Sequence, residues 1–90
     1  MTVRVHVLVE GLVQGVGFRW FAARLAESSG IGGHVRNLLN GQVEVEAEGD
    51  RSLVEQFLKE LKVGPRSAHV THLHVQWKDP LHTEKRFEIR

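Results

Sequence analysis

The spacing of hydrophobic positions changes several times along the chain, and each change predicts a new element. Residues 3–9 alternate, with four valines on one face and mainly polar residues on the other. This period of two, in a segment rich in β-branched residues, is typical of a half-buried strand. From Phe18 to Ala26 the apolar residues recur at helical spacing, which predicts an amphipathic helix. The sequence Ser-Ser-Gly at 28–30 is expected to end it.

A hairpin is expected next. Its strands cover about residues 33–38 and 42–48. Asn40-Gly41 between them predicts a type I′ turn, because that turn needs positive φ at both central residues. In the second of these strands every other residue is a glutamate, and we expect these side chains to face solvent: Glu44, Glu46 and Glu48.

The last third of the chain predicts a second helix and two more strands. Asp50 is a suitable N-cap for the helix, and Gly64-Pro65 should end it. Its expected buried stripe is Leu53, Phe57, Leu58 and Leu61. A strand over about 70–78 should end before Pro80, and a short strand over 86–89 closes the chain. The expected core side of the longer strand is Thr71, Leu73, Val75 and Trp77.

The order of elements predicts the fold class. Each long strand has one polar face, so the helices are expected to cover only one side of the sheet. Right-handed crossovers place both helices on that side. The sequence therefore predicts an α+β ferredoxin-like sandwich, βαββαβ with a short extra C-terminal strand and a mainly antiparallel sheet, formed by residues 1–90 as one domain.

Composition narrows the classes of function. The 12 basic and 11 acidic residues give a net charge of +1, which favours neither nucleic acid nor an anionic membrane as a partner. The chain has no cysteine, which excludes disulfides, thiolate metal ligands and a cysteine nucleophile. It also lacks a transmembrane-length apolar stretch and the pattern of a signal peptide. We therefore expect a cytoplasmic protein and, since no apolar helix face is left over, a monomer.

A glycine-rich stretch, Gly11–Arg19, joins the first strand to the first helix. Its three glycines let the backbone turn sharply and keep side chains away from the main-chain N–H groups. The helix that follows adds free N–H groups and the positive end of its dipole. This combination binds anions, usually phosphate, and the Arg19 guanidinium suits phosphate oxygens. Trp20 lies off the apolar stripe of the helix, and the sequence leaves open whether it flanks the site or packs on the helix edge.

Two motifs resemble the signatures of the acylphosphatase family. The first is Gly11-x-Val13-Gln14-Gly15-Val16-Gly17-Phe18-Arg19. The second is Gly33-His34-Val35-Arg36-Asn37, followed by Gly41-x-Val43 and Gly49. Gly64-Pro65 and Phe87-x-Ile89 fit as well, so the resemblance covers nearly the whole chain. His34 stands where the family usually has an aromatic residue. Because His34 and Asn37 should lie on opposite faces of their strand, we expect this difference to affect packing rather than chemistry.

The resemblance implies a metal-independent hydrolase without a cofactor. Such an enzyme splits the carboxyl–phosphate bond of a small-molecule acyl phosphate into a carboxylate and inorganic phosphate, without a covalent intermediate. The family's catalytic residues fall on Arg19 and Asn37. Its phosphate-binding loop falls on Gln14, Gly15, Val16, Gly17, Phe18 and Arg19. The chemistry is consistent, because phosphoryl transfer depends mostly on positioning and charge stabilisation. An asparagine amide can orient the attacking water.

Three other interpretations stay open at this point. His72 and His74 share a strand face and would supply two ligands of a zinc site, which His6 or a glutamate of the third strand would have to complete. A solvated polar face of the sheet is the favoured interpretation of these histidines. Ferredoxin-like sheets also bind RNA on exposed aromatic residues, although the outward residues of this sheet are charged. The same fold and loop also serve as a non-catalytic phosphate-binding or accessory module. The presence of both Arg19 and Asn37 favours the enzyme.

Overall fold

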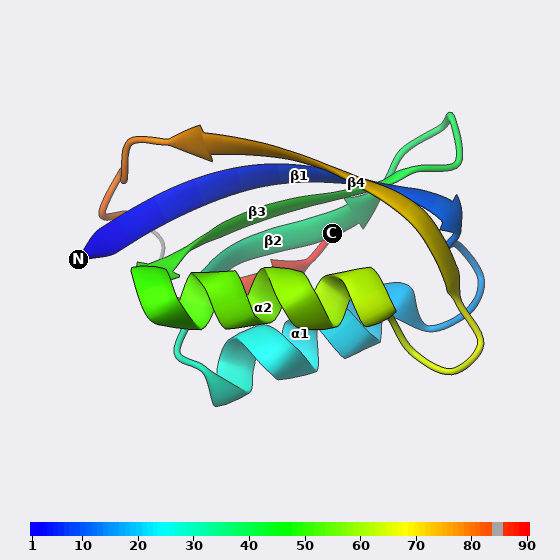
Figure 1. Ribbon diagram of the computed structural model, residues 1–90, viewed down its shortest axis with the longest axis horizontal. Coiled ribbons are helices and arrows are strands. Elements are labelled where there is room, and N and C mark those ends of the chain that lie inside the picture. The colour runs from blue at the N-terminus through cyan, green and yellow to red at the C-terminus, as the bar shows by residue number, and fades with distance from the viewer. Residues whose placement is uncertain (84–85) are drawn as a thin grey trace.

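The computed structural model describes residues 1–83 and 86–90. Five strands and two helices follow one another in the predicted order. Both helices lie on one face of a single twisted sheet (Figure 1). Neither helix in the described ranges is long and apolar enough to cross a membrane. The elements are β1 (Thr2–Leu12), α1 (Phe18–Ser28), β2 (Gly32–Asn37), β3 (Val43–Asp50), α2 (Arg51–Val63), β4 (His69–Lys78) and β5 (Phe87–Ile89).

The strand order in the sheet is β4-β1-β3-β2-β5. β5 pairs parallel with β2, and the other neighbours are antiparallel. The predicted ferredoxin-like sandwich with an extra C-terminal strand is confirmed. The register also positions the site, because Val9 of β1 and Asn37 of β2 both lie opposite Val43 of β3. The C-terminal ends of β1 and β2 therefore meet at the same end of the sheet.

The core fills the space between the sheet and the helices. Phe57 and Leu61 of α2 pack into it, and the inward valines of β1 and β3 are enclosed as alternation predicts. Full burial of a side chain of this size contributes about 1.5–3 kcal/mol. Val13 and Phe18 are each 1% exposed and belong to this core. The glycine-rich loop between them is therefore anchored at both ends.

The buried stripe of α2 is shifted from the predicted one. Leu53, expected in the core, is 42% exposed, whereas its neighbour Val54 is fully buried. Val54, Phe57 and Leu61 follow an i, i+3, i+7 spacing, so the stripe is centred one step around the helix from Leu53. The predicted N-cap is confirmed, because the Asp50 carboxylate accepts a hydrogen bond from the Ser52 N–H at 3.2 Å.

The predicted core side of β4 is wrong except at Leu73. Leu73 packs partly against the core, but Thr71, Val75 and Trp77 are exposed. β4 lies at the edge of the sheet, where its far end passes the beginning of α2 (Figure 1). There the guanidinium carbon of Arg51 lies 4.9 Å from the centre of the Trp77 ring. Alternation identifies the face of a strand, but not how far the helices extend over it.

The β2–β3 hairpin forms where predicted, but with a different turn. The Gly41 N–H donates to Leu38 O at 3.2 Å, and the Leu38 N–H donates to Gln42 O at 2.9 Å. Gly41 has a φ of 93°, but Asn40 is not among the described residues with positive φ. The predicted type I′ turn is therefore wrong. Asn40 Oδ1 accepts the N–H of Gln42 at 3.0 Å, a local bond that favours the turn observed.

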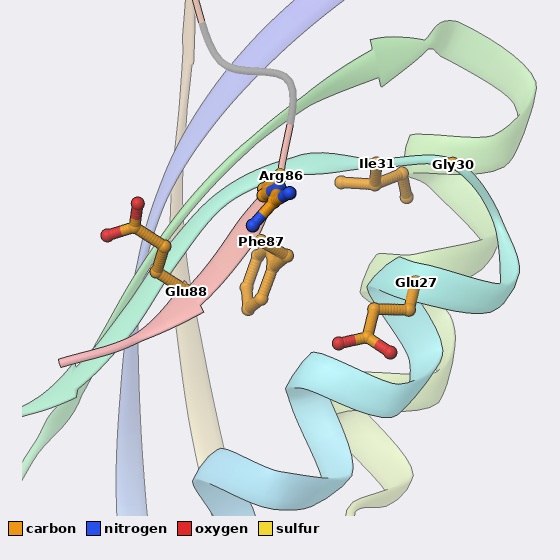
Figure 2. Close-up of a pocket in the computed structure, with 6 residues that line it drawn as sticks. All are labelled: Glu27, Gly30, Ile31, Arg86, Phe87 and Glu88. Carbon is orange, nitrogen blue, oxygen red and sulfur yellow. The ribbon is translucent and has the colours of Figure 1, made fainter.

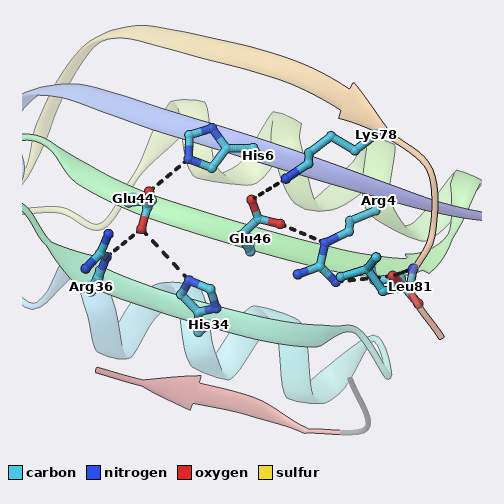
Figure 3. Close-up of polar contacts among 9 residues, drawn as sticks. Arg4, His6, His34, Arg36, Glu44, Glu46, Lys78 and Leu81 are labelled. Carbon is cyan, nitrogen blue, oxygen red and sulfur yellow. Dashed lines mark hydrogen bonds and ion pairs between the residues drawn. The ribbon is translucent and has the colours of Figure 1, made fainter. Parts of the chain in front are cut away.

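The face of the sheet turned away from the helices carries a network of charges (Figure 3). Arg4, Glu46 and Glu48 on this face are buried, and Arg4 donates to Glu46 at 2.8 Å and to Glu48 at 3.2 Å. The segment after β4 folds over one end of the face. There the N–H groups of Leu81 and His82 donate to Glu48 at 2.7 and 2.8 Å. The prediction that Glu46 and Glu48 face solvent is wrong, because Arg4 and this segment cover them.

Glu44 forms a second cluster on the same face (Figure 3). Its carboxylate lies 2.5 Å from Arg36 Nε, 2.9 Å from His6 Nε2 and 3.9 Å from His34 Nε2. The hydrogen bond from Arg36, aided by His6, lowers the pKa of Glu44 to about 2 even though partial burial opposes the shift. Burial alone would raise the pKa of Glu48, but its two main-chain donors and Arg4 together lower it. Both carboxylates therefore stabilise the fold in their ionised form.

Candidate active site

The loop between β1 and α1 presents main-chain N–H groups rather than side chains. Gly15 and Gly17 have φ angles of 74° and 81°, in the left-handed region where other residues are strained. Gly17 is the N-cap of α1, and its carbonyl accepts the N–H of Phe21 at 3.0 Å. A glycine at this position has no side chain to cap the first N–H groups of the helix. The first helical turn also has no acidic residue, so its positive end stays available for an anion.

A cavity of about 170 Å³ lies at this helix end. Its lining comes from three parts of the chain, which are the glycine-rich loop, the first turn of α1 and the end of β2. The lining residues are Val13, Gly15, Gly17, Phe18, Arg19, Trp20 and Asn37. Since one water molecule occupies about 30 Å³ of the liquid, the volume exceeds that of several waters. The cavity therefore has room for a group larger than water beside the helix N-terminus.

Arg19 lines the cavity from the first turn of α1. Its side chain is tied to the residue that follows β5, because Nη1 donates to the main-chain O of Arg90 at 3.3 Å. The Arg90 N–H in turn donates to Val35 O in β2 at 2.8 Å. A guanidinium has five N–H donors, and this bond uses one of them. Arg19 is thus oriented by the fold and keeps donors for a bound anion.

Asn37 lines the same cavity from the last position of β2. It has the same parity as the buried Val35, so it lies on the helix side of the sheet. His34 has the other parity and lies beside Glu44 on the open face. The expected separation of His34 from Asn37 is therefore confirmed.

Gln14 belongs to the predicted phosphate loop, but its side chain points away from the cavity. Its Nε2 donates to Leu38 O at 2.7 Å and to Gln42 O at 2.9 Å. Both acceptors lie in the β2–β3 connection, Leu38 directly after Asn37 and Gln42 directly before β3. Gln14 therefore ties the glycine-rich loop to the hairpin and fixes the spacing between the two. An amide side chain inside a glycine-rich loop is the only sequence signal for this clamp.

The other predicted loop residues divide between the cavity and the core. Val16 packs partly against the core and is not among the lining residues, whereas Phe18 is buried and also lines the cavity. Val13 and Trp20 line the cavity too. In the sequence, the position of Trp20 off the apolar stripe of the helix was the reason to consider that it flanks the site. Trp20 is 69% exposed, so it flanks the site rather than packing under the helix.

A larger hollow, of about 540 Å³, lies at the other end of α1 (Figure 2). Its lining includes Glu27, Arg86 and Glu88. The two carboxylates outnumber the single guanidinium of Arg86, and the negative end of the helix dipole adds to their repulsion of an anion. This hollow is larger than the cavity beside Arg19 but has the wrong electrostatics for a phosphoryl group.

The histidines of β4 do not assemble a metal site. The rings of His72 and His74 lie 4.6 Å apart, but His74 contacts Glu10 of β1, and His6 is engaged with Glu44. Within residues 1–83 and 86–90, no group of three His, Asp or Glu side chains has the arrangement of a metal site. The zinc interpretation therefore gains no support from the described residues.

The fold and the cavity define a class of α+β proteins with a glycine-lined cavity at a helix N-terminus. The family model for acylphosphatase matches residues 5–89, and the chain belongs to the acylphosphatase family, a family of hydrolases. It is 44% identical to the acylphosphatase of Geobacillus thermodenitrificans over 86 residues, which cover 96% of this chain and 92% of that protein.

Solved structures agree with this assignment. The crystal structure of acylphosphatase from Bacillus subtilis matches with a TM-score of 0.95 and 34% identity, covering 100% of this chain and 99% of that chain. A crystal structure of full-length HypF in a phosphate- and nucleotide-bound form matches with a TM-score of 0.87 and 26% identity. That match covers 100% of this chain but 12% of HypF, so the same fold also occurs within a larger protein.

Proposed function

We propose that this chain hydrolyses the carboxyl–phosphate bond of acyl phosphates and releases a carboxylate and inorganic phosphate. In this proposal the Gly15–Arg19 loop and the Arg19 side chain hold the phosphoryl group, and Asn37 orients the attacking water. The observation that carries the proposal is that Arg19, Asn37 and the loop glycines line one cavity at the N-terminus of α1.

The loop supplies charge stabilisation. Phosphoryl transfer has a loose transition state whose negative charge is spread over the phosphoryl oxygens. Main-chain N–H groups and the Arg19 guanidinium meet these oxygens without having to reorganise, because Gly17 caps the helix and Arg90 O holds the guanidinium. By analogy with oxyanion holes, each preorganised donor contributes about 3 kcal/mol to lowering the barrier.

Asn37 supplies positioning. Its carboxamide oxygen accepts a hydrogen bond from the water, and its NH₂ group donates to a phosphoryl oxygen as the transition state forms. The water oxygen forms a bond to phosphorus while the bond from phosphorus to the acyl oxygen breaks. The electron pair of that bond leaves with the carboxylate, and a phosphoryl oxygen takes the proton of the water. A carboxylate is a good leaving group at neutral pH, so the reaction needs neither a strong general acid nor a metal ion.

The test is an assay with acetyl phosphate in the presence of a chelator and in ¹⁸O-labelled water. We expect turnover that is indifferent to the chelator, competitive inhibition by inorganic phosphate, and one label atom per released phosphate. Strict dependence on a divalent ion would contradict the metal-independent mechanism. Label in the carboxylate would contradict attack at phosphorus.

The match to a small part of HypF favours a second candidate, in which the domain binds phosphate without turnover. That candidate predicts phosphate binding and no release of carboxylate in the same assay. We further propose that residues 1–90 form a single domain that is monomeric and cytoplasmic, with no nucleic-acid or membrane partner. Light scattering at micromolar concentration checks the oligomeric state.

A further inference from the structure

A groove of about 580 Å³ runs along α1 beside the proposed active site. Trp20, Phe21, Arg24 and Leu25 line it at positions that repeat every helical turn, and Pro65 of the α2–β4 loop forms a second wall. Trp20 is largely exposed, while Phe21 and Leu25 are partly buried. The groove is therefore a mainly apolar surface with one cation at its rim.

The groove adjoins the proposed phosphoryl cavity. Gly17 and Trp20 line both hollows, which therefore lie side by side at the N-terminus of α1. Asn37 lines the cavity but not the groove. A ligand that fills both hollows thus leaves the cavity past Trp20 and on a path that does not cross Asn37.

This arrangement matches the geometry of the reaction. In an in-line displacement the attacking water and the leaving group lie on opposite sides of phosphorus. If Asn37 holds the water, the acyl group has to leave the cavity by another route. The side that Gly17 and Trp20 share with the groove is the route that does not pass Asn37, and beyond it lie apolar side chains.

We propose that this groove binds the acyl group of the substrate, with Trp20 as the residue that determines specificity. The proposal rests on the proposed function and deepens it by naming a substrate class, namely acyl phosphates with an aromatic or extended apolar acyl group. The ring of Trp20 stacks on such a group, and Phe21, Leu25 and Pro65 remove its far side from water. Arg24 adds positive charge near the rim, which favours the approach of an anionic ligand.

Two non-hydrolysable ligands test the proposal by calorimetry. Phenacylphosphonate and acetonylphosphonate replace the bridging oxygen of benzoyl and acetyl phosphate by a methylene group, and they differ only in phenyl against methyl. We expect the wild type to bind phenacylphosphonate about tenfold more tightly, the preference that partial burial of a phenyl group provides. The ratio of the two affinities is the readout, because any change in the grip on the phosphonate affects both ligands equally.

Variants assign the preference to the groove. Trp20→Ala should reduce the affinity ratio to within about twofold, and Trp20→Phe should retain most of it. Trp77→Ala is the matched control, because it makes the same change at another exposed tryptophan, on β4. The control should keep the wild-type ratio.

Three results would overturn the proposal. The first is that the wild type binds the two phosphonates equally, and the second is that the preference for phenacylphosphonate survives Trp20→Ala. The third is that the wild type is a dimer and that Trp20→Ala dissociates it. The last would assign the groove to a second copy of the chain. Because binding is measured without turnover, a protein that shows the preference but hydrolyses nothing would contradict the proposed function and leave the groove assignment standing.

Discussion

Two regions of this small protein handle charge in opposite ways. On the open face of the sheet, the charges are brought together and paired, as Arg4 is with Glu46 and Glu48. At the N-terminus of α1, positive groups gather without a carboxylate, since the cavity lining contains Arg19 and two glycines but no acidic residue. The first region is built from long side chains on regular strands. The second is built mainly from the main chain of a loop whose glycines have no side chains.

The difference separates stability from binding. A buried carboxylate that meets a guanidinium and main-chain N–H groups has its hydrogen-bonding capacity filled, so it holds the fold together and takes no ligand. A helix N-terminus capped only by Gly17 leaves donors for something outside the chain. Changes on the open face should therefore alter stability with little effect on chemistry, and changes at the cavity should do the reverse.

Arg19→Ala should give the largest effect. Removing the guanidinium takes charge from the transition state, and we expect kcat/KM for acetyl phosphate to fall by at least about 10³-fold. Phosphate inhibition should weaken as well, because the same group binds the product. Steady-state kinetics with Arg51→Ala, at the opposite end of the sheet, provide the control. Wild-type phosphate affinity in Arg19→Ala would contradict the assigned role.

Arg4→Met tests the other half of the comparison. Loss of one partner leaves Glu46 and Glu48 buried with less compensation, which should cost about 3 kcal/mol of unfolding free energy. Urea unfolding measures this loss, and kcat/KM of the folded fraction should stay within about twofold. The exposed Arg66 allows a matched control, Arg66→Met, for which about 0.5 kcal/mol or less is expected. A loss as small as that of the control would show that the buried network contributes little.

Asn37→Ala should separate turnover from binding. An interaction used only in the transition state lowers kcat without weakening the ground state. We therefore expect kcat to fall about 100-fold while the inhibition constant of inorganic phosphate stays within about twofold. Asn40→Ala in the neighbouring hairpin turn is the control. Near-normal turnover in Asn37→Ala would remove Asn37 from the mechanism.

Most of this fold could be predicted from local signals. Alternating valines, the helical spacing of apolar residues, the Asp50 cap and the breaks at Gly64-Pro65 each depend on neighbours in sequence. The errors have a different origin. Trp77 is exposed because the helices do not cover the end of β4, and Leu53 because the buried stripe of α2 is centred one step around the helix. Glu46 and Glu48 are buried because Arg4 and a distant segment cover them. No local pattern contains that information.

The candidate site shows the same division. The glycine-rich loop, the helix start and Arg19 are contiguous, so their joint role could be inferred from one stretch of sequence. Asn37 was predicted as a site residue only from the family resemblance. Its place beside the loop follows from the register of β2 against β3, which no local sequence pattern contains. The clamp made by Gln14 depends on carbonyl groups of a hairpin more than twenty residues away, with bonds to Leu38 and Gln42. The lining role of Trp20 likewise required the packing of α1 against the loop.

Acid sensitivity should come from the open face. Between its ordinary value of 4.5 and a pKa of about 2, Glu44 is ionised in the folded protein and protonated in the unfolded chain. The unfolded state then binds more protons, so stability falls as pH falls through this range, by up to about 1.4 kcal/mol per pH unit for this group. Glu44→Gln should make that slope shallower in urea titrations between pH 2 and 4.5. An unchanged slope, equal to that of the exposed control Glu55→Gln, would contradict the Arg36 and His6 pairing.

Trp77→Ala should have the smallest effect, and it tests whether Trp77 is exposed rather than in the core as its strand parity predicts. A tryptophan in the core would cost about 3–5 kcal/mol on truncation to alanine. Trp77 is instead 44% exposed and contacts the Arg51 guanidinium, an interaction worth about 0.5–1 kcal/mol at such a site. We therefore expect a loss near 1 kcal/mol in urea unfolding and unchanged kcat/KM. A loss of 3 kcal/mol or more, on the scale of a core truncation, would mean that Trp77 is buried in solution and that the end of β4 packs against the rest of the protein.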